Sequence, residues 1–243
     1  VEGPQAVREL VRFRPGAVRD VYVREDAWGT HADVVDAARR ATRWVHPVTA
    51  EVSAVLSRDS QGVCAVASAD AVSRELPEPS VGETLVVLAQ GRDPGNVGTI
   101  IRTADAFGAV GVITVSGTVE ATSPKVVRAS AGSVFHIPVC IVPSFEEAHA
   151  LIHRRSAALL GTSGGAGSLD LSQMLAQGVS GRSRLSQSHA WVFGNEAKGL
   201  SGAEMRLCDA LVSIPMTGDA ESLNVASACS PPRPCEPWRS DVS

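Results

Sequence analysis

The stretch TLVVLAQGRDPGNVGTIIRTADAFGA, residues 84–109, joins an apolar run to a glycine-containing turn and then to a segment with helical periodicity. Apolar residues recur between Ile100 and Phe107 at the spacing of one helix face, which predicts a helix over residues 96–107. A strand, a glycine turn and a helix in this order are typical of an α/β domain, and such a turn can bind phosphate. The turn lacks the G-x-G-x-x-G spacing of nicotinamide-dependent oxidoreductases, which argues against an enzyme of that class.

The chain after this stretch repeats the alternation of short apolar runs and helix-prone segments. Strands separated by helices predict a mostly parallel sheet with helices on both faces. Functional loops should follow the carboxyl ends of the strands, where the glycine-rich segments fall. One such glycine-rich segment, GTSGGAGSLDL at residues 161–171, predicts only the end of a strand and a flexible loop. Further strands are expected in residues 110–116, 137–143, 158–163, 190–196 and 210–216.

Residues 1–69 hold a smaller set of elements ahead of this region, including an amphipathic helix whose expected N-cap is Thr30. The polar, proline-bearing segment at residues 70–83 is the expected linker to a second domain of residues 84–243. Strands of the first domain are expected in residues 18–26, 43–49 and 62–68.

The composition limits the classes of protein to which the chain can belong. With 243 residues, of which 44% are hydrophobic, the chain can bury one large core or two smaller ones. We find no run of about eighteen apolar residues and no signal sequence, so we expect a cytoplasmic protein without a membrane span. The five cysteines are scattered and lack C-x-x-C spacing, which argues against disulfides and a bound metal. The formal net charge of -4 means that any binding to nucleic acid would need local clusters of arginine.

Two polar residues of the opening stretch could serve chemistry or have ordinary structural roles. Asn96 could cap the helix or offer its amide to a ligand. Arg102 lies on the polar side of the expected helix, where it could pair with Asp105 three residues later. Taken alone, both residues favour the structural role.

Two later segments also follow expected strands and could line a ligand site. In VFGNEAKGLS, residues 192–201, Glu196 could meet a ligand or stabilise the start of the next helix through its dipole. In VSIPMTGDAESLNVA, residues 212–226, Pro215 stops a strand and leaves backbone carbonyls available to a ligand. Ser222 in the same segment could be an ordinary N-cap.

Three motifs stand in series along the chain: N-x-G-x-x-x-R from Asn96, F-G-N-E-x-x-G-L from Phe193, and I-P-M-x-G-x-x-E-S-L-N-V from Ile214. Together they closely resemble the signatures of the SpoU (TrmH-like) branch of the SPOUT RNA methyltransferases. This resemblance covers residues 84–226. Through shorter motifs, residues 1–69 resemble the small RNA substrate-binding domain that precedes many of these catalytic domains.

The resemblance implies an α/β fold whose C-terminal part forms a deep trefoil knot, a rare topology. It also implies an S-adenosylmethionine-dependent homodimer, without metal, that methylates a ribose 2′-hydroxyl in RNA. The presence of the N-terminal domain favours rRNA of the 23S type by analogy of architecture, and tRNA is the alternative substrate.

The same resemblance assigns roles to individual residues. Arg102 would activate the hydroxyl, and because a guanidinium is rarely deprotonated, we expect it to stabilise the developing alkoxide and to bind the adjacent phosphate. Arg128 and Ser130 could contact an RNA phosphate, and an ordinary helix-terminal arginine is an equally good interpretation of Arg128. The other expected catalytic residues are Asn96, Glu196, Ser222 and Asn224. The expected cofactor-binding residues are Thr162, Ser163, Gly164, Gly194, Asn195, Glu196, Ile214, Pro215, Met216, Ser222 and Leu223.

The segment CSPPRPCEPWRSDVS, residues 229–243, departs from the family, which continues at this point with a helix rich in alanine and leucine. Its prolines would each cost about 3 kcal/mol or more inside a helix, so we expect no such helix here. We expect the tail to impair the knot, the dimer or the affinity for the cofactor. A catalytically impaired RNA-binding protein of the same fold is therefore a further alternative, although the intact set around Arg102 argues against complete loss of activity.

Overall fold

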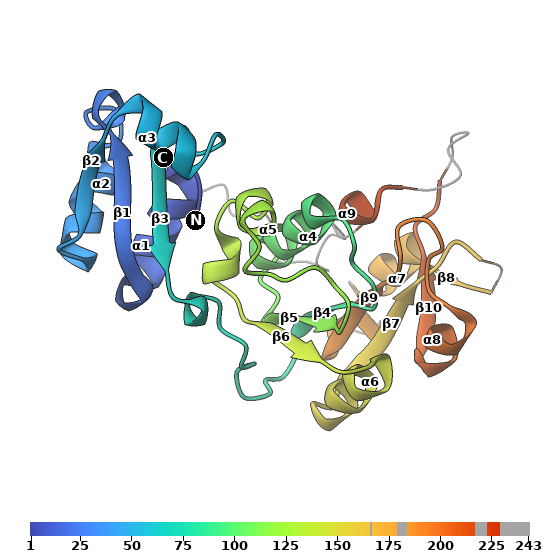
Figure 1. The fold of residues 1–243 in the computed structure, drawn as a ribbon. Helices are drawn as coiled ribbons and strands as arrows, with labels where there is room; N and C mark the ends of the chain where they lie inside the picture. Colours follow the sequence, from blue (N-terminus) through green and yellow to red (C-terminus); the bar gives the residue numbers. More distant parts are fainter. Residues whose placement is uncertain (166, 179–183, 217–222, 229–243) are drawn as a thin grey trace. The chain divides into compact units, whose positions relative to one another are not determined.

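A computed structural model of the protein describes residues 1–165, 167–178, 184–216 and 223–228. The chain forms two compact units, which are described separately (Figure 1). The first unit holds Val1–Glu75 together with Asp93–Asp105 and Val119–Val139. The second unit holds Leu76–Arg92, Ala106–Thr118 and the described residues from Cys140 onward.

The second unit is built on a seven-stranded sheet with the strand order β6-β5-β4-β9-β7-β10-β8. The recorded registers between its described strands are parallel. This confirms the expected α/β class with a mostly parallel sheet. Strand β8 lies in the segment that we expected to be a loop. The strands are β4 (Thr84–Leu88), β5 (Gly111–Val115), β6 (Val139–Val142), β7 (Ala158–Thr162), β8 (Leu169–Asp170), β9 (His189–Phe193) and β10 (Ala210–Ser213).

The helices of the second unit are α6 (Phe145–Arg154), α7 (Leu171–Gly178), α8 (Gly202–Leu207), α9 (Val225–Ala228) and the 3-10 helix η5 (Arg184–Ser186). Helices α6 and α8 share a buried core with alternate residues of β9. Ala190 and Val192 face this core. Because side chains alternate along a strand, Trp191 and Phe193 face the opposite side of the sheet. Strand β9, the central strand of this sheet, therefore presents the rings of Trp191 and Phe193 on the face opposite the core.

A buried ion pair fastens the segment that precedes β4. Glu83 and Arg155 are only 4% and 8% exposed, and Nε of Arg155 donates to the Glu83 carboxylate at 2.7 Å. A second guanidinium nitrogen donates to the other carboxylate oxygen at 2.8 Å, and the third donates to the carbonyl of Pro77 at 2.9 Å. Burial by itself raises the pKa of Glu83, but the hydrogen bonds from Arg155 and Ser80 outweigh it, so that the pKa is lowered from its ordinary value.

The first unit begins with a three-stranded sheet in the order β2-β1-β3. Its central strand β1 (Val18–Arg24) pairs in parallel with β2 (Val45–Val48) and antiparallel with β3 (Val63–Ala67). Pro47 is tolerated in β2 because an edge strand needs no N–H on its open side. Helices α1 (Pro4–Phe13) and α2 (Ala32–Ala41) pack against the face that carries the buried side chains of β1. The other helices of this part of the chain are α3 (Ala50–Leu56), α4 (Pro94–Ala106), α5 (Pro124–Ala129) and the 3-10 helices η1 (Pro15–Ala17), η2 (Glu25–Ala27), η3 (Ala69–Ala71) and η4 (Ser133–Phe135).

Two helices begin differently from the expectation. Helix α2 begins after His31, so the expected N-cap role of Thr30 is wrong. Helix α4 begins at Pro94, where Asp93 accepts the backbone N–H of Asn96 at 2.8 Å. Asp93 therefore caps α4, and Asn96 lies inside its first turn rather than at the cap.

Among the described residues, we find no helix with the length and apolar character needed to cross a membrane. The trefoil knot stays a prediction, because residues 217–222 and the atypical tail at 229–243 lie outside the described ranges. The division of the chain into domains at residues 69 and 84 also stays a prediction, since the expected linker is divided between the two compact units.

Candidate functional site

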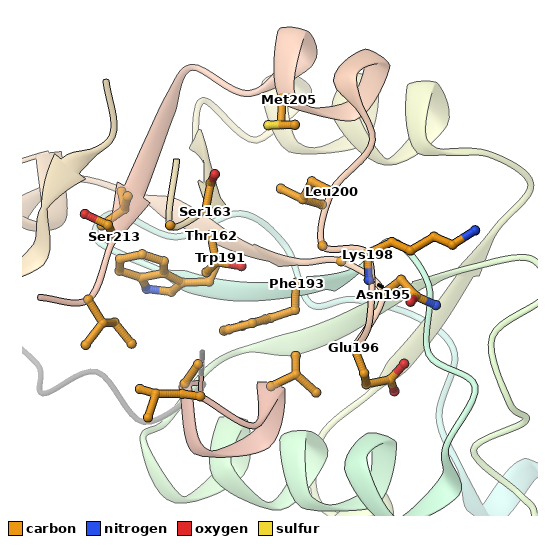
Figure 2. A pocket seen from close by; sticks show the side chains of 18 of the residues that line it. Thr162, Ser163, Trp191, Phe193, Asn195, Glu196, Lys198, Leu200, Met205 and Ser213 are labelled. Atoms are coloured by element: carbon orange, nitrogen blue, oxygen red, sulfur yellow. Dashed lines mark hydrogen bonds between the residues drawn. The ribbon is translucent and has the colours of Figure 1, made fainter. Parts of the chain in front are cut away.

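A pocket of about 390 Å³ lies at the carboxyl ends of three adjacent strands, β7, β9 and β10 (Figure 2). Thr162, Phe193 and Ser213 are the last residues of these strands, and all three line the pocket. The carboxyl ends of parallel strands are where α/β sheets bind ligands. The volume falls within the range of small-molecule sites, about 300 to 1,000 Å³. The pocket is therefore the candidate functional site.

Two aromatic side chains of β9 form an apolar part of this pocket. Figure 2 shows the rings of Trp191 and Phe193 reaching into it, and both residues are otherwise buried, with 6% and 1% of their surface exposed. Met216 and Leu223 also line the pocket, but 42% and 45% of their surface is exposed. Apolar surface that is left open inside a pocket favours a ligand with a flat or apolar part.

The motif G-N-E-A-K-G forms a closed turn in the wall of the pocket. The backbone N–H of Asn195 donates to the carbonyl of Gly199 at 3.0 Å, and the N–H of Gly199 donates back at 2.8 Å. Oδ1 of Asn195 accepts the backbone N–H groups of Ala197 and Lys198 at 3.0 and 3.1 Å. The asparagine oxygen therefore shapes the turn.

The turn is held tightly at both of its ends. A Cβ atom on Gly194 would lie 2.4 Å from the carbonyl carbon of Gly199 and 2.5 Å from the nitrogen of Leu200, so only glycine fits there. After the turn, Ser201 caps α8: its hydroxyl accepts the N–H of Glu204 at 3.3 Å. The Glu204 carboxylate accepts the N–H of Ser201 at 2.6 Å, which completes a capping box.

Polar groups stand beside the apolar surface. Glu196 and Lys198 are exposed and project from the turn in different directions (Figure 2). At the end of β7, the hydroxyl of Thr162 donates to a carbonyl of β9 at 2.8 Å, and the N–H of Ser163 donates to a carbonyl of β10 at 3.0 Å. The pocket thus combines a carboxylate, hydroxyls and backbone groups with aromatic and aliphatic walls.

The pocket gathers most of the residues that we expected to bind a cofactor. Pro215 stands between two lining residues without being one itself, and Ser222 lies outside the described residues. The expected residues that line the pocket are Thr162, Ser163, Gly164, Gly194, Asn195, Glu196, Ile214, Met216 and Leu223. Sequence reasoning missed the contributions of β9, α7 and α9, chiefly Trp191, Phe193, Leu171, Val225 and Ala228. Aromatic residues two positions apart on a buried strand, directly before G-N-E, were the available signal.

The expected catalytic residues are distributed over both units. Asn96 and Arg102 belong to the first unit, and Glu196 and Asn224 belong to the second. Oδ1 of Asn224 accepts a backbone N–H two residues later at 2.8 Å, at the start of α9. Asn224 therefore has the capping role that we considered for Ser222.

Arg102 is exposed on α4. The alternative pairing with Asp105 is not formed, because Oδ2 of Asp105 lies 2.7 Å from Nδ1 of His136 instead. Within the described ranges, no ion pair is recorded for the guanidinium of Arg102. A positive charge without a carboxylate partner suits an anionic ligand such as a phosphate.

The two residues that we expected at the RNA have internal contacts. A terminal nitrogen of Arg128 lies 2.7 Å from a carboxylate oxygen of Glu2 and 2.9 Å from one of Asp59. Ser130 is fully buried, and its hydroxyl donates to the carbonyl of Val127 at 2.9 Å. A buried and hydrogen-bonded hydroxyl does not reach a phosphate at the surface. The geometry therefore does not support the expected contact between Ser130 and RNA, and Arg128 fits the helix-terminal arginine that was its alternative interpretation.

Comparisons with known proteins agree with one another. A sequence model of the SpoU rRNA methylase family matches residues 83–230. A 23S rRNA (guanosine-2′-O-)-methyltransferase of Bordetella pertussis is 32% identical over 233 residues, which cover 93% of this chain and 91% of that one. The crystal structure of the SpoU methyltransferase AviRb of Streptomyces viridochromogenes has a TM-score of 0.75 at 28% identity, covering 95% of this chain and 84% of that chain. A structure of AviRb in complex with the cofactor AdoMet has a TM-score of 0.70 at 29% identity, covering 95% and 85%.

Proposed function

The chain belongs to the SpoU rRNA methylase family, which confirms the resemblance of its three motifs, and from this premise we propose that it methylates a ribose 2′-hydroxyl of 23S rRNA. The methyl donor is S-adenosylmethionine, the cofactor bound in the related AviRb structure. The observation that carries the proposal is the pocket at the ends of β7, β9 and β10, because two of the three motifs build its walls.

The residues of the pocket fit S-adenosylmethionine in their chemistry. The open apolar surface of Met216 and Leu223, together with the ring of Trp191, suits a flat adenine. Ser163 and Glu196 suit the hydroxyl and ammonium groups of the same molecule. When bound, S-adenosylmethionine supplies a methyl group on a positively charged sulfur, which makes that carbon open to attack by an oxygen nucleophile.

Arg102 is the residue that we assign to the ribose hydroxyl. This hydroxyl is a very weak acid, so the negative charge that develops on its oxygen has to be stabilised while its proton passes to solvent water. A guanidinium keeps its own proton in proteins, and Arg102 therefore acts as a positive charge and a hydrogen-bond donor rather than as a base. Its exposed position lets it meet an RNA phosphate as well.

The other expected catalytic residues have supporting roles. Asn96, in the first turn of α4, offers its amide to the same ribose–phosphate unit as Arg102. Glu196 orients polar groups at the edge of the pocket, and Asn224 fixes the start of α9, whose Val225 lines the pocket. Holding both reactants in place is itself worth up to roughly 7 to 11 kcal/mol of the barrier to a reaction of two molecules.

We place the protein in the cytoplasm, where ribosomal RNA is found, and we expect a homodimer on the basis of the family resemblance. The tail at residues 229–243, which departs from the family, lies outside the described residues. Whether the chain is an active enzyme or an inactive RNA-binding protein is therefore decided by an activity measurement.

Arg102→Ala tests the assignment. Loss of one donor to a developing negative charge lowers kcat by about 10²- to 10³-fold in other enzymes, and we expect a loss of this size in methyl transfer to 23S rRNA. Affinity for S-adenosylmethionine, measured by calorimetry, should stay unchanged. Arg154→Ala, which removes an exposed arginine from the last turn of α6, is the matched control and should keep full activity. A wild-type protein without transfer activity, or an Arg102→Ala variant with full activity, would contradict the proposal.

A further inference from the structure

A row of aromatic rings lies on the sheet of the first unit, on the face opposite the buried side chains of β1. Tyr22 of β1 is in register with His46 of β2, and their rings stack with centroids 5.0 Å apart and planes 23° apart. Trp44, two residues before His46, continues the stack at 6.3 Å and 18°. These three residues are called the aromatic row.

The row ends at the surface of the molecule. Half of the surface of Trp44, 50%, is exposed, and the side chain of His46 is 37% exposed. Nε2 of His46 lies 2.9 Å from a carboxylate oxygen of Asp20, which fixes the plane of its ring. An ordered stack of rings with an exposed tryptophan at its end leaves one aromatic surface open to a further flat group.

One arginine lies at the exposed end of the row. The guanidinium carbon of Arg43 lies 4.8 Å from the centroid of the Trp44 ring. Arg39 and Arg40 occupy the last turn of α2, which packs on the other face of the sheet, and the guanidinium carbon of Arg39 lies 5.3 Å from the centroid of the Trp28 ring. Residues 37–49 contain three arginines and neither aspartate nor glutamate, although the whole chain has a formal net charge of -4. The segment that carries Trp44 is therefore locally positive in sequence, and Arg43 is the cation that lies at the ring itself.

Stacked rings beside arginines are the chemistry by which proteins bind unpaired nucleotides, with bases on the rings and phosphates on the cations. An exposed contact between Arg43 and Trp44 is weaker than the stacking of a base on tryptophan. A base can therefore take the place of the Arg43 side chain over the ring and leave the guanidinium for a phosphate. A second copy of the chain is a poorer occupant, because a symmetric contact on this surface would bring like-charged arginines together.

We propose that the aromatic row is a stacking site for an unpaired base of the RNA substrate, with Arg43 positioned for its phosphate. The identity of the ligand as RNA rests on the proposed function. The contribution of the row is to the binding of the substrate, so it should show in RNA affinity even when no methyl group is transferred.

Binding of a fluorescein-labelled oligo(A) RNA of about twelve nucleotides, measured by anisotropy without S-adenosylmethionine, tests the proposal. Trp44→Ala should weaken this binding by about 5- to 150-fold, the range found for the loss of one stacked base, whereas Trp44→Phe should keep most of the affinity. Val55→Ala, which truncates an 87% exposed apolar side chain of α3, is the matched control and should bind as the wild type does. A duplex RNA of the same length, whose bases are not free to stack, should respond little to Trp44→Ala.

Unchanged binding of oligo(A) by Trp44→Ala would overturn the proposal, as would an equal loss for the single strand and the duplex. A change in oligomeric state by light scattering without a change in RNA affinity would also overturn it, since it would assign the surface to a second copy of the chain. If the wild type binds RNA through Trp44 but transfers no methyl group to 23S rRNA, the stacking site stands and the proposed function fails.

Discussion

Gly194→Ala is expected to distort the turn that forms part of the pocket wall and so to weaken the binding of S-adenosylmethionine. The new Cβ atom would lie 2.4 Å from the carbonyl carbon of Gly199 and 2.5 Å from both its oxygen and the nitrogen of Leu200. Non-bonded carbon atoms normally stay about 3.5 to 4.0 Å apart, so the two segments would have to separate by about 1 Å. All three atoms belong to the backbone, and no side-chain rotation can relieve the contact.

The size of the effect follows from what the separation would disturb. Inserting one methyl group into a tightly packed place costs about 1 to 3 kcal/mol. The turn is closed by the paired backbone hydrogen bonds of Asn195 and Gly199 and by the Asn195 side chain, and each such bond contributes about 0.5 to 1.5 kcal/mol net. We expect most of this free-energy cost to appear as weaker binding of S-adenosylmethionine, so its dissociation constant should rise by about 10- to 100-fold.

Titration calorimetry with S-adenosylmethionine measures this change, and thermal unfolding separates it from loss of the fold. Gly202→Ala is the matched control: it changes the first residue of α8, outside the pocket wall, and its Cβ would meet only the flexible end of Arg206 at 3.6 Å. We expect this control to bind like the wild type. Equal affinity of Gly194→Ala and the wild type would refute the reasoning that connects this turn with the cofactor.

The remaining predictions concern stability and reactivity. Glu83→Gln leaves the buried guanidinium of Arg155 without its charged partner and should lower the free energy of unfolding, measured by urea titration, by about 3 to 5 kcal/mol. Adding Arg155→Met to this variant should restore much of the lost stability. A Glu83→Gln variant as stable as the wild type would contradict this prediction. Because the pKa of Glu83 is lowered on folding, its stabilisation should be complete above the unfolded pKa of about 4.3 and be lost as the pH falls through the folded pKa, a pH dependence that Glu83→Gln should remove. Burial, helped by the charges of Asp209 and Glu204, raises the pKa of Cys208 to about 11, so at pH 8 iodoacetamide should modify this thiol at least about tenfold more slowly than a free cysteine, as followed by mass spectrometry; an equal rate would contradict it.

The sequence was most informative where function and topology coincide. Ligand loops follow the carboxyl ends of parallel strands, and the G-N-E and I-P-M motifs follow two such strands, β9 and β10. The alternation of apolar runs and helices was therefore enough to predict that these loops lie at one edge of a sheet. Ser144 and Glu147 have the sequence spacing of a capping box, and the Ser144 hydroxyl accepts the N–H of Glu147 at 3.3 Å.

The sequence was less informative where a role depends on distant neighbours. Ser130 was predicted to lie at the RNA, but close packing at Gly98 buries the end of α5: a Cβ on Gly98 would lie 2.5 Å from the Cβ of Ala129 and 2.9 Å from the nitrogen of Ser130. No local pattern reveals such an approach between helices far apart in the chain. Asp105 is a similar case. Its partner is His136, which is far away in the sequence, whereas the expected partner Arg102 is only three residues away.

Other differences had a signal that pattern reasoning did not use. The stretch from Asp93 to Asn96 offers two possible N-cap residues, Asp93 and Asn96. Proline favours the first position of a helix, so Pro94 indicates that the residue before it, Asp93, is the cap. Ser201 and Glu204 have the spacing of a capping box, which the structure contains in full. Strand β8, by contrast, had no such signal, because Leu169–Asp170 is too short to show the alternation by which strands are predicted.

The position of the transferred methyl group tests the central claim most directly. The protein would be incubated with 23S rRNA and S-adenosylmethionine labelled in its methyl group, and the RNA would then be hydrolysed with alkali. Methylation of a 2′-hydroxyl removes the group that attacks the neighbouring phosphodiester, so the account predicts that the label is recovered in an alkali-resistant dinucleotide. Label in a free mononucleotide would place the methyl group on a base, and this result, like the absence of label, would contradict the account.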